Sequence, residues 1–159
     1  MDAVLIPKDL RDFIASPVLM LVSVAGAGGA LAIARGLGAE VGPDCEIDMF
    51  VSRAQWPDAV AALTPGAKVA TTFVQPATYE TYQVKGVVRW TAPASAADRL
   101  GVKAYADAVL AILCGLGLRR HQILAFLSAD DPIRLRFAPQ AVFLQTPGPG
   151  AGQPLESLA

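Results

Sequence analysis

The sequence predicts a mainly β protein with some α-helix, in which six antiparallel strands close into a barrel. Two observations predict this fold class. Segments of strand length, either continuously apolar or alternating, follow one another with Gly- and Pro-containing turns between them, an order typical of β-hairpins. One long helical pattern and two short ones accompany these strands. A closed barrel uses this inventory because closure leaves no strand edge exposed.

The first half of the chain predicts two short helices and three strands. Residues 8–15 form the first helix, which ends before a Ser-Pro pair. The second helix, over residues 56–63, has Pro57 at its first position and Asp58 in its first turn, and both suit a helix N-terminus. The three strands are Val18–Val24, Ala30–Leu37 and Glu46–Val51.

The turn between the first two strands is rich in glycine and invites a dinucleotide-binding interpretation. That fingerprint, G-x-G-x-x-G, needs each glycine for a separate task in the turn. Gly26 and Gly28 supply the first two, but Leu31 stands where the third is required. No repeated alternation of strands and helices follows. We therefore interpret this segment as a hairpin turn.

Residues 68–90 predict two more strands, joined at Gln75–Thr78. Because side chains alternate across a strand, the second of them has two different faces. One face carries Gln83, Lys85 and Arg89, and it meets either water or a bound, negatively charged small molecule. The pattern leaves both interpretations open. The other face is mostly apolar and consists of Tyr82, Val84, Gly86, Val88 and Trp90.

The longest helix is expected to begin near Ser95, which with Asp98 forms a pattern similar to a capping box. The residues after it carry an apolar stripe at helical spacing. We expect this helix to connect the fifth strand to the last strand. That strand covers residues 133–145 and is interrupted at Pro139, which forces a bulge or bend. From Thr146 onwards the chain is too rich in Pro and Gly for regular structure.

Length and composition indicate one apolar domain. The 159 residues suffice for a single core, and we expect a barrel domain over residues 1–145 with a Pro/Gly-rich tail over 146–159. Hydrophobic residues make up 53% and charged residues 17%, so the chain has apolar surface to spare. Such surface often forms an oligomer interface, and we expect a homodimer.

Several classes of partner are not supported by the composition. A net charge of −1 gives no basis for nucleic-acid binding. The apolar stretches are too short to span a membrane, and the first residues do not resemble a signal peptide, so we expect a cytoplasmic protein. Cys45 and Cys114 are far apart and form no CxxC motif, so we expect free thiols and no metal site. Cys114 lies in an apolar helical segment and is expected in the core.

The residues best suited to bind a ligand are polar groups at two places. Arg35 lies within an apolar strand, so it either reaches a carboxylate such as Glu40 or Asp48 or holds an anion with its guanidinium. Three polar residues follow the third strand, directly before a helix, where backbone N–H groups favour a phosphate. They are Ser52, Arg53 and Gln55. Asp58 places a negative charge in the same turn, so these residues alone favour an ordinary loop.

No catalytic set of residues is evident. His121 is the only histidine, and it follows two arginines near a helix end. Asp130 and Asp131 precede a proline and are typical of loop acids. If the protein is an enzyme, its reactive atoms are therefore expected to belong to a bound cofactor.

Taken together, these segments resemble the pyridoxamine 5′-phosphate oxidase-like proteins, the FMN-binding split-barrel family. The resemblance extends from about Phe13 to Gly152 and depends on the order of four segments, with a helix between the third and the fourth. The fourth segment resembles the C-terminal motif of a subgroup of short family members. The four segments are FIASPVLMLVSVAGAGGALAIARGLG (13–38), EIDMFVSRAQ (46–55), KVATTFVQPATYETYQVKG (68–86) and AVFLQTPGPGAG (141–152).

The resemblance implies a fold, a cofactor and site residues. The fold is a six-stranded antiparallel split β-barrel of Greek-key topology, with a crossover helix and short flanking helices. The cofactor is FMN, bound at the interface of a homodimer. Arg35 matches the family's arginine for the phosphate, and Gln83 matches its glutamine for the flavin, with Lys85 two residues further on. Ser52, Arg53 and Gln55 match the second phosphate cluster only in part, because its lysine is missing.

Two functional hypotheses remain open. In the first, the protein is a flavin-dependent oxidoreductase for an unidentified small molecule. Residues of the oxidase that hold pyridoxal have no match here, so vitamin B6 oxidation is not implied. In the second, the protein is a non-catalytic dimeric module that binds a small ligand (flavin, haem or deazaflavin) or that has no cofactor.

Overall fold

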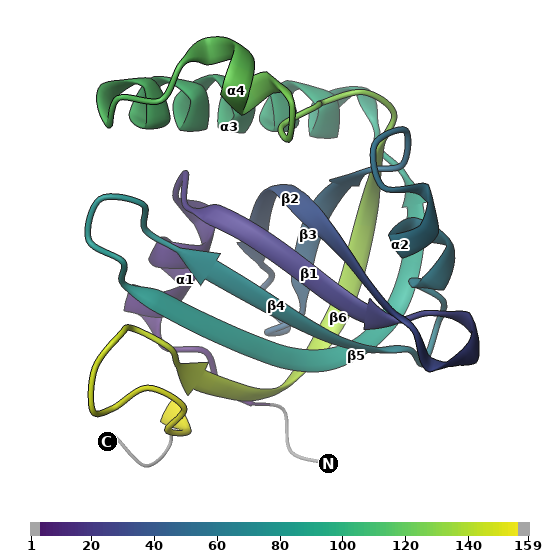
Figure 1. The fold of residues 1–159 in the computed structure, drawn as a ribbon. Helices are drawn as coiled ribbons and strands as arrows, with labels where there is room; N and C mark the ends of the chain where they lie inside the picture. The colour runs from purple at the N-terminus through teal and green to yellow at the C-terminus, as the bar shows by residue number, and fades with distance from the viewer. Residues whose placement is uncertain (1–3, 156–159) are drawn as a thin grey trace.

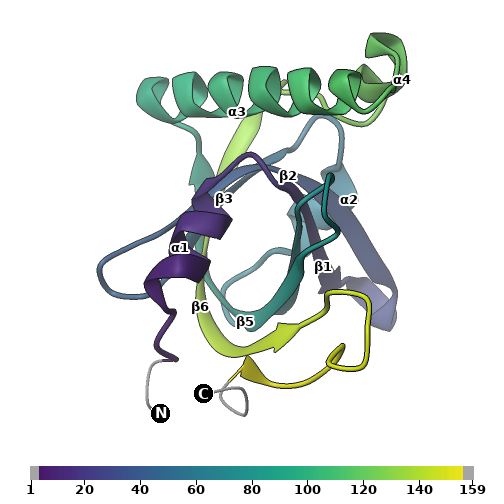
Figure 2. The same ribbon diagram turned by 90° about the vertical axis from the view of Figure 1, so that its left-hand side faces the viewer.

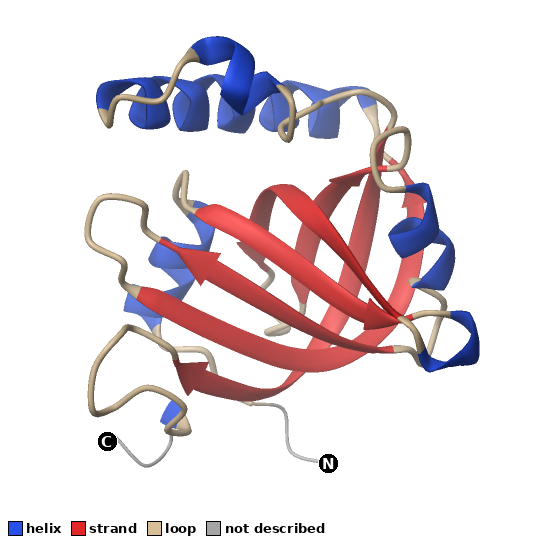
Figure 3. Ribbon diagram, viewed as in Figure 1, coloured by secondary structure: helices blue, strands red, loops and turns tan. Residues whose placement is uncertain are grey.

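The computed structural model describes residues 4–155 and confirms a closed antiparallel barrel of six strands (Figure 1, Figure 3). Around the barrel the strands follow the order β1-β2-β3-β6-β5-β4, so β1 pairs with both β2 and β4. The strands are β1 (Leu19–Ala25), β2 (Leu31–Val41), β3 (Ile47–Ser52), β4 (Lys68–Val74), β5 (Thr81–Pro93) and β6 (Pro132–Leu144). Every strand predicted from the sequence is present.

The helices lie around the barrel rather than inside it (Figure 1, Figure 2). The capping box predicted for the long helix is confirmed, since Ser95 Oγ accepts from the N–H of Asp98 and the Asp98 carboxylate accepts from the N–H of Ser95. This helix lies outside the ring of strands, along one side of the barrel (Figure 2), where Tyr105 Oη donates to the carbonyl of Val18 at 2.6 Å. The helices are α1 (Lys8–Ala15), α2 (Pro57–Ala62), α3 (Ala96–Gly115) and α4 (Arg120–Leu124), with a 3₁₀ turn, η1 (Ala27–Gly29), between β1 and β2.

Bulges bend the long strands and change which side chains face inward. The bulge predicted at Pro139 is confirmed, because the pairing of β5 with β6 shifts between Lys85 and Gly86, opposite Ala141 and Pro139. A second shift leaves one extra residue between Val88 and Trp90. It turns Trp90 outward, where the side chain is 38% exposed, so its expected place on the inner apolar face is wrong.

The hydrophobic core lies inside the barrel and extends to the buried side chains of α1 and α3. Cys114 is exposed near the end of α3, so its expected place in the core is wrong, because only one stripe of that helix faces the barrel. Both cysteines are free thiols. The largest fully buried side chains are Phe73, Phe137, Ile6, Ile14, Met20, Leu37, Ile47, Met49, Leu63, Ile123, Leu135 and Val18.

The tail is irregular but packs on the barrel. After β6 the chain turns back, and the N–H of Leu144 donates to the carbonyl of Gln153 at 3.0 Å. The N–H of Gly152 donates to the carbonyl of Leu144 at 2.7 Å. Residues 156–159 of the expected tail lie outside the described residues. None of the described helices is both long and apolar enough to cross a bilayer.

Candidate functional site

Three of the residues expected to bind a ligand share one outer face of the barrel, formed by β2, β1, β4 and β5. Strand pairing places Arg35 opposite Leu21, Leu21 opposite Thr72, and Thr72 opposite Gln83. These side chains therefore form one transverse row. The next row on the same face contains Lys85, paired with Ala70, which pairs with Ser23, which pairs with Ile33. Closure of the barrel brings β2 and β5 to the same face.

Arg35 is a partly buried cation without an anionic partner in the described part of the chain. Glu40 and Asp48, which were considered as its partners, instead lie 3.7 and 2.7 Å from Arg134. The guanidinium of Arg35 stacks on Phe126, 4.8 Å from the ring centroid. The pairing of Arg35 with a carboxylate is thus wrong, and its role in anion binding stays a prediction.

Arg35 has a weak electrostatic effect on the phenol of Tyr105 on α3. Burial raises the pKa of Tyr105, and the positive charge of Arg35 counteracts part of this rise.

Gln83 and Lys85 present their polar groups at the other end of the row. The amide nitrogen of Gln83 donates a long hydrogen bond to Thr72 Oγ1 at 3.4 Å, and its carbonyl oxygen has no donor among the described residues. Lys85 Nζ lies 4.7 Å from the ring centroid of Phe143, which holds the ammonium over the face. A hollow of about 320 Å³ next to Lys85 also receives Lys68, Ser23 and Gln140.

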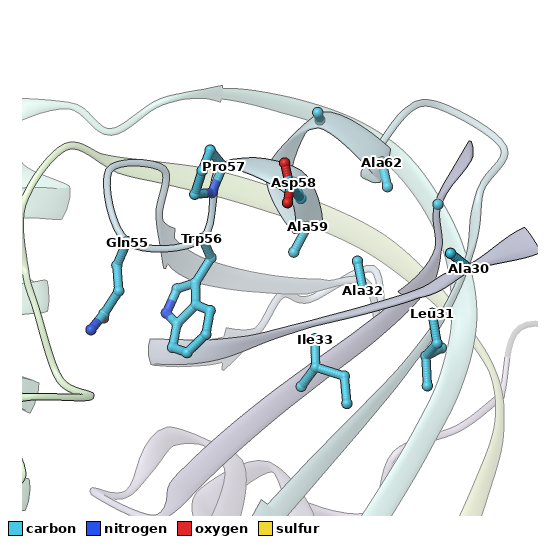
Figure 4. A pocket seen from close by; sticks show the side chains of 12 residues that line it. Ala30, Leu31, Ala32, Ile33, Gln55, Trp56, Pro57, Asp58, Ala59 and Ala62 are labelled. Atoms are coloured by element: carbon cyan, nitrogen blue, oxygen red, sulfur yellow. The ribbon is translucent and has the colours of Figure 1, made fainter. Parts of the chain in front are cut away.

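The surroundings of these polar groups are apolar and exposed. Leu31 and Ile33 on β2 are 67% and 51% exposed. Beside them, a groove of about 590 Å³ separates β2 from α2, with Trp56 as its aromatic wall (Figure 4). Most of its other lining residues are small and apolar: Gly26, Ala30, Ala32, Pro57, Ala59, Ala61 and Ala62.

Ser52, Arg53 and Gln55 lie together after β3, but each is engaged in a contact within the chain. Ser52 Oγ donates to the carbonyl of Asp130 at 2.6 Å and accepts from the N–H of Gln55. Arg53 makes a bidentate ion pair with Asp131 at 2.8 and 3.0 Å. Gln55 donates to the carbonyl of Ala125.

The ion pair between Arg53 and Asp131 changes the pKa of both side chains. Hydrogen bonds from Arg53 lower the pKa of Asp131 below its ordinary value, and the same bonds raise the pKa of Arg53. The sequence pattern indicated two loop acids at Asp130 and Asp131 but not this contact. A basic residue after one strand and an acid before another would pair only if those strands were neighbours, as β3 and β6 are.

Other features of the site had no signal in the sequence. Phe126 and Phe143 each hold one of the site's cations, yet both lie far from those cations along the chain. The two rows contain no carboxylate, imidazole or thiol: their members are Arg35, Leu21, Thr72, Gln83 and Phe143, and Ile33, Ser23, Ala70, Lys85 and Ala141. In the described part of the chain, no group of His, Cys, Asp or Glu side chains is arranged to hold a metal ion.

Solved structures of several proteins share this fold at low sequence identity. An F420 reductase aligns over 86% of this chain and 98% of its own, with a TM-score of 0.56 and 15% identity. HupZ of Group A Streptococcus aligns over 93% of this chain and 100% of its own, with a TM-score of 0.53 and 14% identity. A protein of Lactobacillus delbrueckii, assigned provisionally as a pyridoxamine 5′-phosphate oxidase, aligns over 87% and 93%, with a TM-score of 0.52 and 12% identity.

These structures establish a shared split-barrel fold and not a shared function. Comparison of the sequence with models of known families and with curated proteins finds no match. The chemistry of the site therefore depends on this chain's own residues. The two rows offer two separated cations and an amide with apolar neighbours, and they contain no carboxylate, imidazole or thiol.

Proposed function

We propose that this protein is a homodimer that binds FMN on the outer face of β2, β1, β4 and β5 and acts as a flavin-dependent oxidoreductase on a small molecule. The observation that carries the proposal is the row from Arg35 to Gln83, with Lys85 beside it. It places an unpaired guanidinium at one end of the face and an amide with an ammonium at the other. This is the arrangement that a ligand with a phosphate and a polar ring requires.

The dimensions of the row support a ligand of this length. Arg35 and Gln83 are three strand steps apart, and steps of about 4.8 Å give roughly 15 Å between their backbones. Both side chains are long and lie on the same face. A single compact anion could not reach both, whereas an extended molecule with its phosphate at Arg35 could reach Gln83 with its ring.

Each residue has a distinct task in this proposal. Arg35 binds the phosphate with a charge-assisted, bidentate contact. Gln83 orients the ring through its free carbonyl oxygen and its weakly held amide N–H. Lys85 keeps a positive charge beside the ring and stabilises negative charge that develops there during reduction. The flavin, when bound, supplies the redox chemistry, which is consistent with the lack of a catalytic set on this face.

A second copy of the chain is the proposed cover for the apolar surround. Leu31 and Ile33 are exposed at successive outward positions of β2, beside the apolar groove, and an exposed apolar patch often marks an interface. Pairing two such faces would bury both side chains and remove water from the cations, which strengthens their attraction for an anion. The ligand would then lie at the interface between the two copies.

The names of similar structures agree with the ligand class. One is an F420 reductase and another is assigned provisionally as a pyridoxamine 5′-phosphate oxidase. Both share the barrel on which the Arg35 row is built. Because their sequence identity to this chain is only 15% and 12%, the proposal names neither a substrate nor an electron donor.

One observation favours a second candidate function, a non-catalytic dimeric module that binds flavin, haem or deazaflavin, or no cofactor. Ser52, Arg53 and Gln55 are all engaged by contacts within the chain. FMN would then be held at its phosphate by Arg35 alone. Weaker phosphate binding would suit a protein that stores or senses a ligand.

A titration distinguishes these candidates. The purified protein is examined for a flavin spectrum and then titrated with FMN and with riboflavin by calorimetry. We expect FMN to bind more tightly than riboflavin, and bound FMN to be reduced and reoxidised by added donors and acceptors over many turnovers. Binding without turnover would favour the module. The absence of binding to either flavin would overturn the FMN proposal.

A further inference from the structure

Four of the predicted site residues contact one short segment between α4 and β6. Arg35 stacks on Phe126, and Gln55 donates to Ala125 O and accepts from the N–H of Ser128 through its Oε1. Ser52 and Arg53 contact Asp130 and Asp131. The segment from Ala125 to Asp131 therefore lies along the whole set of residues that were expected to hold a phosphate.

We propose that the turn Ser128–Asp131 is a gate over the phosphate site, in which Asp131 occupies Arg53 until a phosphate-bearing ligand displaces it. This inference rests on the proposed function, whose site it closes. The gate is defined by its two ends. Leu127, before it, is 6% exposed, and Pro132, after it, begins β6. Only the residues between these two anchors have to move.

The contact that closes the gate imitates a ligand. Asp131 presents two oxygens to the Nε and the terminal nitrogen of Arg53, as a phosphate would. The backbone supports this contact, because the N–H of Arg53 donates to the carbonyl of Asp131 at 3.0 Å. Asp131 has a φ of 44°, a conformation that residues other than glycine rarely adopt.

The same contact is weak enough to yield to a ligand. The side chains of Arg53 and Asp131 are 52% and 42% exposed, and ion pairs that are open to solvent contribute little. A phosphate carries more negative charge than one carboxylate and forms a bidentate contact of the same geometry with Arg53. A phosphate group therefore competes successfully for the guanidinium, and Ser52 Oγ is released with it.

A buried donor without a partner among the described residues lies in the same turn as Ser52 and Gln55. The indole N–H of Trp56 is buried and has no acceptor among the described residues. Its backbone N–H donates to the carbonyl of Ser52, so both residues belong to one turn. Figure 4 shows the ring nitrogen of Trp56 on the side of Gln55. Buried donors are nearly always paired, and in this proposal an anion bound beside the turn supplies the missing acceptor.

The test compares two neighbouring acids. Asp131→Asn keeps the shape of the side chain and tolerates the same backbone conformation, but it removes the charge that holds Arg53. Asp130→Asn is the matched control, because Asp130 reaches Ser52 through its backbone carbonyl, and its carboxylate bonds to Ser128 and to no arginine among residues 4–155. Each variant and the wild type are titrated with FMN, riboflavin and inorganic phosphate.

For FMN, we expect Asp131→Asn to bind about two- to fivefold more tightly than wild type, as the loss of an exposed ion pair allows. Asp130→Asn should match wild type, and riboflavin, which has no phosphate, should bind equally to all three. Equal FMN affinities would overturn the gate. So would an equal gain in both variants, because it would show a general effect of charge.

Inorganic phosphate tests the gate without a flavin. The chain has two tryptophans, so its indole N–H resonances can be assigned with a Trp90→Phe variant. We expect phosphate to shift the Trp56 resonance and not that of Trp90, at lower concentrations in Asp131→Asn. If phosphate does this while neither flavin binds, the gate stands and the FMN proposal fails. If FMN binds and phosphate leaves Trp56 unmoved in every variant, the gate is wrong.

Discussion

Arg35 on β2 and Gln83 on β5 lie in one transverse row of the barrel wall, with Leu21 and Thr72 between them. Their strands are distant in the chain and come together because β1 pairs on both sides, with β2 and with β4. The row joins two residues that otherwise have no evident connection. Its polar ends and apolar surround define a binding face that can be tested residue by residue.

Removing the guanidinium at one end of the row should weaken FMN and spare riboflavin. Arg35→Ala loses a charge-assisted contact with the phosphate, and we expect FMN affinity to fall about tenfold or more. The control is Arg89→Ala, since Arg89 pairs with Glu46 and is not part of either row. Calorimetry measures both variants. Unchanged FMN affinity in Arg35→Ala would show that the phosphate binds elsewhere.

Removing the ammonium at the other end should change the redox potential more than the affinity. Lys85→Gln takes away a positive charge near the ring, so we expect the midpoint potential of bound FMN to fall by about 20–40 mV. Lys103→Gln on α3 is the control, because Lys103 pairs with Asp107, belongs to neither row nor to the hollow beside Lys85, and loses the same charge. A spectroelectrochemical titration measures the potentials. Equal changes of the midpoint potential in the two variants would show that Lys85 has no specific role beside the ring.

A charge in the apolar surround should separate the two copies. Ile33→Glu places a carboxylate on a side chain that the proposed interface would bury in both subunits, which is costly. We expect wild type to have the mass of a dimer by light scattering and the variant that of a monomer. Leu100→Glu on α3 is the control, since Leu100 is 73% exposed and lies away from the face. A dimeric Ile33→Glu would place the interface elsewhere.

The ion pair of the gate predicts a pH dependence with a definite sign. Arg53 lowers the pKa of Asp131 in the folded protein below the ordinary value of 3.8. The pair therefore stabilises the fold fully above that value, and its contribution is lost as the pH falls through the folded pKa. A carboxyl NMR titration should show this low pKa, and Arg53→Gln should restore it. An ordinary pKa in the wild type would mean that the pair does not persist in solution.

Two glycines should respond in opposite ways to alanine. A Cβ at Gly86 would lie 2.3 Å from the carbonyl oxygen of Ala138, so Gly86→Ala should destabilise the barrel by about 1–3 kcal/mol. A Cβ at Gly101 in α3 would meet no atom within 4 Å. Gly101→Ala should therefore stabilise the protein by about 0.5–1 kcal/mol. Urea denaturation measures both, and a neutral Gly86→Ala would contradict the close approach of β5 and β6.

Local patterns in the sequence were sufficient for the elements and their order. The hairpins, the Ser95 capping box and the bulge at Pro139 were all predicted, because each depends on residues close together in the chain. The exposed place of Trp90 was not predicted. One extra residue in β5 reverses the alternation there, and whether a strand bulges depends on its partner strand.

The sequence by itself determined six strands in mostly hairpin order, an inventory typical of a closed barrel, and the residue types available for a ligand. Only the tertiary structure decided which of those residues are already paired within the chain and which can contact a ligand. Closure set Arg35, Gln83 and Lys85 on one face, while the pairing of β3 with β6 brought Arg53 to Asp131. The physical reason is that secondary structure follows from neighbours in the chain, whereas the partner of a charge is chosen by contacts between distant strands.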